Sequence, residues 1–174
     1  MSRSLSNLES KLILHLEWEK LPVVTVDDAA HFLGISRDYA RKVLQRLARD
    51  KWLAVIIPGK YELIPAERGE HAFPDTNPLF IGSQLVTPYY FSFATAAYFH
   101  GLTTQASQTV FIATLESKTH RRLVREKTYQ IVHQSLHHFF GFREVNAYGS
   151  QIVMAEPEKT ILDALHRPIY IGDI

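Results

Sequence analysis

Apolar side chains recur at every third or fourth position over much of the first fifty residues, which is the spacing of amphipathic helices. Residues 6–20, SNLESKLILHLEWEK, follow this pattern and stop before Pro22. Residues 25–34, TVDDAAHFLG, begin with Thr25 and carry Asp28 three positions later, an arrangement that predicts a capping box. The sequence therefore predicts two short helices joined by a turn that contains proline.

A third helix and a hairpin are predicted to follow. Gly34 ends the second helix, and Ser36 is the predicted N-cap of a helix that runs to about Asp50. Two strand-like runs, WLAVII (52–57) and KYELI (60–64), are joined by a Pro-Gly pair. Three helices followed by a hairpin predict a winged helix-turn-helix.

The third helix has two chemically different halves. At about 100° per residue, the half predicted to face the core carries Tyr39, Ala40, Val43, Leu44 and Leu47. The other half carries Arg37, Asp38, Arg41, Lys42, Gln45, Arg46 and Arg49. Because Arg and Gln make paired hydrogen bonds with base edges, we expect the major groove of DNA to meet Arg37, Arg41, Lys42 and Gln45.

Phosphate contacts are expected around the same surface. Ser36 and the first-turn N–H groups of the helix favour an anion. Four cations are expected to contact the DNA backbone, the last of them at the tip of the hairpin: Arg46, Arg49, Lys51 and Lys60. An arginine-rich helix face is also typical of an ordinary solvated surface. The order of the helices and the basic hairpin tip, more than the charge, therefore favour DNA binding.

The net charge of +1 conceals an uneven distribution. Residues 1–60 hold ten Lys or Arg and seven Asp or Glu, whereas residues 61–174 hold nine and eleven. Positive charge confined to one part of the chain indicates a small binding surface instead of a basic tail.

Composition excludes several classes of site. The 174 residues contain no cysteine, so disulfides, thiolate nucleophiles and cysteine-ligated zinc are excluded. No apolar run approaches the roughly 20 residues that cross a bilayer, and the start MSRSLSNLESK lacks the apolar region of a signal peptide. We expect a cytoplasmic protein without membrane contact, cofactor or bound metal.

The composition changes after the hairpin. Residues 65–78 are rich in proline and charge and are predicted to link a DNA-binding domain at 1–64 to a second domain at 79–174. Periodicity in the second domain predicts helices at 91–101 and 157–166 and strands at 109–114, 128–134 and, as a pair, within 146–155. The expected fold is α+β, with an N-terminal winged helix-turn-helix followed by a mixed α+β C-terminal domain.

Three segments resemble the second domain of the AbiEi-type antitoxins: YYFSFATAAYFHGLTTQ (89–105), FFGF (139–142) and EPEKTILDALHRPIYIGDI (156–174). In that family a Tyr-x-Ser segment leads into a helix ending His-Gly-Leu-Thr, and a Glu-Lys-Thr-x-x-Asp helix precedes a Pro and a Gly. The matching residues are Tyr90, Ser92, Ala96, His100, Gly101, Leu102, Thr103 and Gln105, then Glu158, Lys159, Thr160, Asp163, Pro168 and Gly172.

The resemblance implies a transcriptional repressor and antitoxin that is not an enzyme. Such proteins open with a winged helix-turn-helix that binds inverted repeats in promoter double-stranded DNA and represses its own operon. The second domain supports neutralisation of a nucleotidyltransferase-like toxin, in type IV systems that act in phage defence by abortive infection and do not require direct contact. Family members usually continue with further helices, so a C-terminal truncation or a short variant is expected at Ile174.

A second basic patch lies in LESKTHRRLVREK, residues 115–127. It could contact DNA phosphates that flank the main site, a tRNA-like surface or the toxin. The alternative is a solvated loop or short helix between two strands. Its cations are Lys118, Arg121, Arg122, Arg125 and Lys127.

Two patterns suggest metal chemistry but are expected to be coincidental. Glu116 and Lys118, with Asp75 upstream, match the residue types of a PD-(D/E)xK nuclease, although Asp75 lies in the proline-rich segment. The three histidines of the segment HQSLHH have a metal-like spacing only on a helix, and a strand is predicted where they begin: His133, His137 and His138.

The last predicted helix carries Glu158, Lys159 and Asp163. Glu158 suits the positive end of the helix dipole, and Lys159 to Asp163 is an i,i+4 ion pair. The apolar residues predicted to face the core are Ile161, Leu162 and Leu165. A structural role is expected for these charges, and a toxin-directed or regulatory surface is the alternative.

Two other functions remain open from the sequence. The chain could be a winged-helix regulator whose second domain senses a ligand or forms an oligomer, with no toxin partner. It could also be a protein-interaction module whose basic helix never meets DNA.

Overall fold

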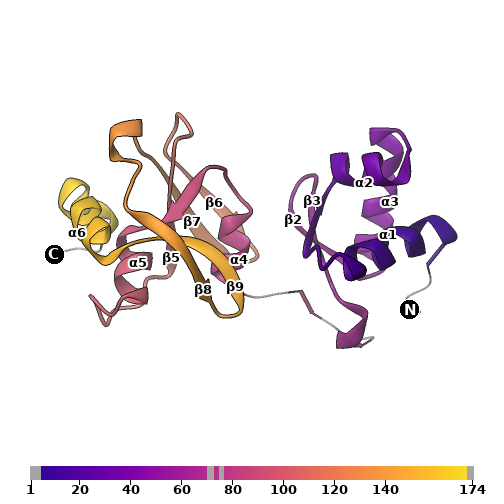
Figure 1. Cartoon of the computed structure of the whole chain (residues 1–174), viewed down its shortest axis with the longest axis horizontal. Helices are drawn as coiled ribbons and strands as arrows, with labels where there is room; N and C mark the ends of the chain where they lie inside the picture. Colours follow the sequence, from indigo (N-terminus) through magenta and orange to yellow (C-terminus); the bar gives the residue numbers. More distant parts are fainter. Residues whose placement is uncertain (1–4, 70–72, 75–76, 172–174) are drawn as a thin grey trace. The chain divides into compact units, whose positions relative to one another are not determined.

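The computed structural model describes residues 5–69, 73–74 and 77–171. The chain divides into two compact units, Met1–Asp75 (unit 1) and Thr76–Ile174 (unit 2), each with its own sheet (Figure 1). The division falls within the predicted linker, 65–78, whose bounds stay a prediction. The α+β class is confirmed, and among the described helices none is long and apolar enough to cross a membrane.

Unit 1 consists of three helices and a small antiparallel sheet. The helices are α1 (Asn7–Trp18), α2 (Val26–Leu33) and α3 (Arg37–Arg49). The strands, in their order in the sheet, are β1 (Val23–Thr25), β3 (Lys60–Leu63) and β2 (Leu53–Ile57). The three helices and the β2–β3 hairpin were predicted, whereas β1 was not, because three residues after a proline carry no readable alternation.

The buried face of α3 agrees with the predicted periodicity except at one residue. Four of the five predicted core residues are at most 1% exposed: Ala40, Val43, Leu44 and Leu47. The prediction for Tyr39 was wrong, because its side chain is 45% exposed. At the helical repeat, Tyr39 lies roughly a quarter-turn from the middle of the buried stripe, at the edge of the contact with α1 and α2.

Each helix of unit 1 begins after an N-cap residue whose side chain accepts a backbone hydrogen bond: Ser6, Thr25 and Ser36. Thr25 and Asp28 form the predicted capping box, with the Thr25 N–H donating to the Asp28 carboxylate at 2.9 Å. Gly34 ends α2 in the left-handed conformation, with φ of 65°. A second capping box joins Ser6 and Glu9 at the start of α1, where the Ser6 N–H donates to Glu9 Oε2 at 2.9 Å.

Acid is expected to destabilise unit 1 through these two capping carboxyls. Burial would raise the pKa of Glu9, but hydrogen bonds from Ser6 and the charge of Arg46 lower it from the ordinary 4.5. The hydrogen bonds from Thr25 lower the pKa of Asp28 from 3.8. A lowered pKa in the folded state adds stability above the unfolded pKa, and this stability is lost as the pH falls through the folded pKa.

The free energy of unfolding of unit 1 should therefore fall as the pH is lowered. The loss due to Glu9 begins near its ordinary pKa of 4.5, and the loss due to Asp28 begins near 3.8. Buried Glu9 contributes a slope of up to about 1.4 kcal/mol per pH unit, and exposed Asp28 contributes less, because solvent screens its contacts. Urea unfolding of the wild type and of Glu9→Gln at several acidic pH values measures this slope. Equal slopes for the two proteins would contradict the role given to Glu9.

Unit 2 is built on a six-stranded mixed sheet. Its strands, in their order in the sheet, are β6 (His120–Val124), β7 (Lys127–His133), β5 (Thr109–Thr114), β4 (Tyr89–Phe91), β9 (Ser150–Ala155) and β8 (Phe142–Ala147). The pairs β5–β7 and β4–β9 are parallel and the others antiparallel. The helices are α4 (Pro78–Ser83), α5 (Phe93–Phe99) and α6 (Pro157–His166).

The long apolar strands of unit 2 were predicted and the short or polar elements were not. Strands β5 and β7, the β8–β9 hairpin and helices α5 and α6 lie at or near their predicted positions. The segment that forms β6 was not predicted to be a strand, because HRRLV lacks the apolar run of a central strand. It is an edge strand that pairs with β7, so it can remain polar.

The predicted orientation of α6 was wrong. Ile161, Leu162 and Leu165 were expected in the core, but they are 49%, 51% and 75% exposed. The buried residues of this helix are Lys159, Thr160 and Asp163. Helical spacing predicts that a helix has two faces but does not predict which one is buried. In unit 2 the polar face of α6 is buried, because hydrogen-bond donors from other segments meet Asp163 there.

Candidate nucleic-acid interface

A groove of about 460 Å³ lies on unit 1 between the start of α2, the exposed face of α3 and the β2–β3 turn. The lining side chains that the sequence predicted to contact DNA come from α3 and from the start of β3, and Asp27 at the start of α2 lines the groove as well. Arg37, Arg41 and Gln45 come from α3 and Lys60 from the start of β3. The groove thus collects four of the residues that the sequence predicted to contact DNA.

The fold of unit 1 explains why these four side chains meet. Arg37, Arg41 and Gln45 are spaced four residues apart, so they form one row along α3. The opposite face of α3 is buried against α1 and α2. At the other side of the groove the Val26 N–H donates to the Gly59 carbonyl at 3.1 Å, which fixes the turn before Lys60 against the start of α2.

Carboxylates at the surface pair with three of the predicted DNA-contacting arginines; Asp27 and Asp38 are exposed, and Asp50 is 30% exposed. Arg37 Nε lies 2.9 Å from Asp27 and Arg41 Nη1 lies 3.1 Å from Asp38, while Arg49 Nε lies 3.1 Å from Asp50. Solvent-exposed pairs of this kind contribute only about 0.2–1 kcal/mol. Their arginines can therefore exchange a carboxylate for a phosphate at small cost.

The other predicted contacts on α3 and after it are exposed or partly exposed. Lys42 and Gln45 are both exposed, and in the described part of the chain Lys42 forms no ion pair. Lys51 is exposed just after the helix. Lys60 lies close enough to Asp28 for its charge to lower the pKa of that carboxyl. Ser36 caps α3 by accepting a hydrogen bond from the Tyr39 N–H at 3.3 Å.

Arg46 differs from the other cations of α3. Its Nε lies 3.0 Å from Oε1 of Glu9, a carboxylate that is almost buried at the start of α1. The same carboxylate caps α1. This ion pair holds α3 against α1, so Arg46 has a structural role whether or not it also meets a phosphate.

Replacing Arg46 with alanine is expected to lower the free energy of unfolding of unit 1 by about 1–3 kcal/mol, because the Glu9 carboxylate loses its cationic partner. Lys42→Ala, which removes the same charge from an exposed position, should change stability by less than about 0.5 kcal/mol. Urea unfolding of the two variants checks the difference. If the two variants were equally stable, the ion pair between Arg46 and Glu9 would not stabilise unit 1.

The second basic patch is divided between two faces of the sheet. Lys118 precedes β6, Arg125 lies in the β6–β7 turn and Lys127 begins β7. Arg121 and Arg122 are neighbours on β6, so their side chains point to opposite faces. The segment is a strand instead of the loop or short helix given as the alternative. Its role toward nucleic acid stays a prediction.

The residues of the two metal-like patterns do not form a shared cluster where they are described. Glu116 lies in the bend after β5, and its carbonyl is 2.8 Å from the ring of His133. Asp75 lies outside the described residues. His137 and His138 are in a short 3-10 helix, Leu136–His138. Among the described residues, no group of three or more His, Asp or Glu side chains could hold a metal ion.

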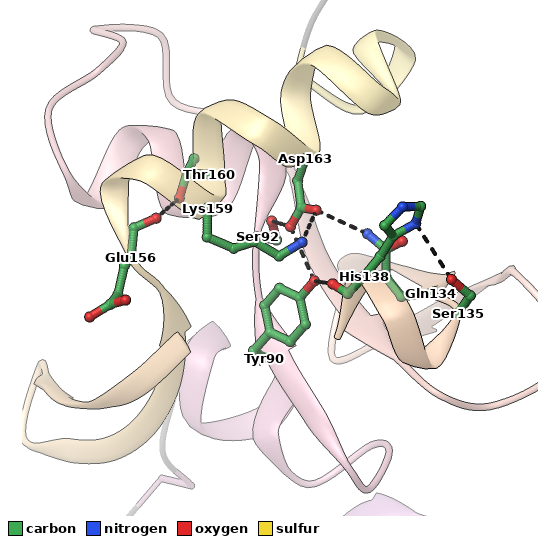
Figure 2. A network of polar contacts seen from close by, with 9 residues as sticks. All are labelled: Tyr90, Ser92, Gln134, Ser135, His138, Glu156, Lys159, Thr160 and Asp163. Atoms are coloured by element: carbon green, nitrogen blue, oxygen red, sulfur yellow. Dashed lines mark hydrogen bonds and ion pairs between the residues drawn. The ribbon is translucent and has the colours of Figure 1, made fainter. Parts of the chain in front are cut away.

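Unit 2 contains a buried polar cluster centred on the carboxylate of Asp163. Lys159 Nζ donates to Oδ1 at 2.6 Å and the Gln134 amide donates to the same oxygen at 3.2 Å. The Ser92 hydroxyl donates to Oδ2 at 2.6 Å and the Tyr90 hydroxyl to the same oxygen at 3.1 Å. Figure 2 shows these four side chains pointing at Asp163: Lys159 from α6 itself, Tyr90 and Ser92 from β4 and the residue after it, and Gln134 from the residue after β7.

The cluster is enclosed by protein. The side chains of Lys159 and Asp163 are 4% and 2% exposed. Lys159 Nζ also lies 4.6 Å from the ring centre of Phe140, in the segment that follows the 3-10 helix. Gly141 lets that segment approach α6, because a Cβ at Gly141 would lie 3.0 Å from the Cβ of Lys159. Burial, together with the nearby charge of Asp163, raises the pKa of Tyr90 well above its ordinary 10.0.

The cluster unites residues from the segments whose motifs carried the family resemblance. Tyr90 and Ser92 stand 65 or more positions before Lys159 and Asp163 in the chain, yet all four meet at one carboxylate. Gln134 was missed, because a single amide at the end of an apolar strand carries no distinguishing pattern. These contacts tie α6 to β4 and to the end of β7, which gives the cluster a structural role.

The family model described as "Transcriptional regulator, AbiEi antitoxin" matches residues 11–64. This match confirms the predicted resemblance for unit 1, over the segment from α1 to the end of the hairpin. The motifs that first indicated the resemblance lie in unit 2, outside the matched range. Among curated proteins, none matches the chain.

The chain is also similar in fold to the RV2827C protein from Mycobacterium tuberculosis, whose crystal structure is known. The TM-score is 0.63 at 20% sequence identity, and the alignment covers 98% of this chain and 64% of that chain. The chain thus spans less than two thirds of the length of this relative. At this identity the similarity is one of fold.

Proposed function

We propose, from the match of residues 11–64 to the AbiEi transcriptional regulators, that this chain binds promoter double-stranded DNA and represses transcription. The observation that carries the proposal is the groove on unit 1, where α3 and the β2–β3 turn present Arg37, Arg41, Gln45 and Lys60 together. Unit 1 then acts as a winged helix-turn-helix, with α3 as recognition helix and the β2–β3 hairpin as wing.

In this proposal the contacts divide by chemistry. Arg37, Arg41 and Lys42 reach guanine edges in the major groove, and Gln45 pairs with adenine. The backbone phosphates are bound by cations around the groove, which gives affinity but no sequence information. The backbone-binding set is Arg46, Arg49, Lys51 and Lys60, with Ser36 and the first turn of α3 beside one phosphate.

We further propose that the protein is the antitoxin of a type IV toxin-antitoxin system acting in phage defence, with autoregulation through inverted repeats. The family described for residues 11–64 supports the antitoxin assignment. Its functional partner would be a nucleotidyltransferase-like toxin, without need of direct contact, and the chain itself would not be an enzyme. A promoter-binding role requires a cytoplasmic location.

A gel-shift titration against DNA from upstream of the gene tests the DNA-binding part. Arg37→Ala/Arg41→Ala should bind that DNA at least about thirtyfold more weakly, since each paired base contact is worth about 1–3 kcal/mol. Lys11→Ala/Lys20→Ala is the matched control, because it removes two exposed cations of unit 1 that do not line the groove. Equal losses in both variants, or no preference over random DNA, would favour the protein-interaction module.

A further inference from the structure

A carboxylate lies in the groove of unit 1, on the surface proposed to meet DNA. Among the described residues that line this groove, Asp27 is the only acidic one. It belongs to the first turn of α2, and its Oδ1 lies 2.9 Å from Nε of Arg37, the first residue of α3. A negative charge that faces phosphates weakens binding to DNA of any sequence. Asp27 therefore needs a role other than affinity.

Asp27 differs from the carboxylates that are nearest to it in kind. Asp28, the next residue, accepts hydrogen bonds from Thr25 in the capping box that starts α2. Asp38 pairs with Arg41 at 3.1 Å but does not line the groove. Asp27 and Asp38 each occupy the second position of a helix, with side chains that are 70% and 85% exposed. Of these three carboxylates, Asp27 is the one that joins α2 to the start of α3 inside the groove.

DNA in the groove would change the balance of this ion pair. In water, Arg37 can leave Asp27 for a phosphate at small cost, because the pair is exposed. When DNA fills the groove, a carboxylate left behind would face a polyanion with less water to screen it, which is unfavourable. Arg37 is therefore expected to keep its Nε contact with Asp27 and to offer its two Nη groups, the paired donors that match O6 and N7 of guanine.

We propose that Asp27 is a specificity-determining residue, which holds the guanidinium of Arg37 on a guanine edge and away from the phosphates. This inference rests on the proposed binding of promoter DNA and adds to it the partner that orients one base contact. The N-terminal residues of a recognition helix contact base edges, and Arg37 begins α3. Asp27 touches no base in this arrangement, so it is a positioning residue that acts through Arg37.

Fluorescence anisotropy with DNA from upstream of the gene, and with random DNA of the same length, tests the proposal. Asp27→Ala should bind random DNA about threefold more tightly, because Arg37 becomes free to bind a phosphate. Its preference for the upstream DNA should fall at least about fivefold, because one paired base contact is lost. A residue that only stabilised the fold would weaken binding to both DNAs alike.

Asp38→Ala is the matched control for this measurement. It removes the same charge from the same helical position, and from an ion pair with an arginine of α3, but outside the groove. Its preference for the upstream DNA should stay within about twofold of the wild type.

A double-mutant cycle shows whether Asp27 acts through Arg37. On upstream DNA substituted at each base pair in turn, Asp27→Ala and Arg37→Ala should relax the same base pair. Asp27→Ala/Arg37→Ala should then be no less selective than Arg37→Ala. Losses that add at two separate base pairs would overturn the inference. So would an unchanged preference in Asp27→Ala, which leaves the proposed function standing, whereas a wild type that does not prefer the upstream DNA would overturn both.

Discussion

Replacing Asp163 with alanine is expected to lower the free energy of unfolding of unit 2 by about 3–5 kcal/mol, because it leaves Lys159 as a buried charge without its partner. Asp163 accepts hydrogen bonds from four side chains, and the ammonium of Lys159 lies 2.6 Å from its Oδ1. Losing the carboxylate therefore also leaves the donors of Ser92 and Gln134 without their acceptor and leaves the Tyr90 hydroxyl only the His138 carbonyl, 3.4 Å away. Urea unfolding, followed by a signal specific to unit 2, measures the change.

Two further variants separate the ion pair from the rest of the cluster. Lys159→Met/Asp163→Leu replaces both charges by apolar side chains of similar size, and it should lose less stability than Asp163→Ala alone. Ser92→Ala removes one neutral donor and should cost about 1 kcal/mol. If Asp163→Ala were as stable as Ser92→Ala, the buried ion pair would not hold α6 on the sheet as described.

The affinity for operator DNA is expected to fall about a thousandfold between 50 and 200 mM salt if six phosphates are neutralised. This corresponds to a slope of about −5 in a plot of log affinity against log salt concentration. The cause is the release of counterions from DNA when the cations of unit 1 replace them. Fluorescence anisotropy at a series of salt concentrations measures the slope.

Two variants distinguish backbone contacts from base contacts. Lys60→Ala should reduce the magnitude of the slope by about one, since it removes one phosphate contact. Gln45→Ala should leave the slope unchanged and weaken only the preference for operator over random DNA, because an amide displaces no counterion. Affinity that does not depend on salt would contradict the proposed mode of binding.

Much of unit 1 could be predicted because its signals are local. Thr25 with Asp28 and Gly34 fix the ends of α2 through hydrogen bonds and backbone conformation within a few residues. The alternation of charged and apolar residues along α3 places Ala40 and Val43 inside and Arg41 outside. The pairing of Arg46 with Glu9 could not be predicted, because 37 residues separate them and only the packing of α3 on α1 brings them together.

Unit 2 could be predicted less well, for a reason that α6 makes clear. The sequence determines that residues 157–166 form a helix with one polar and one apolar face, because periodicity and the proline at its first position are local properties. It also determines that Lys159 and Asp163 lie on the same face.

Only the tertiary structure decided which face of α6 is buried. Tyr90, Ser92 and Gln134, from two distant segments, meet as hydrogen-bond donors where α6 docks, so they stabilise a buried carboxylate and select the polar face. The sequence by itself therefore determined the three helices of unit 1 together with α5 and α6, the cap of α2 and the row of basic residues on α3. The long-range contacts decided that the charges of α6 are internal and its aliphatic residues exposed, because the free energy of burying a charge depends on partners that no local pattern encodes.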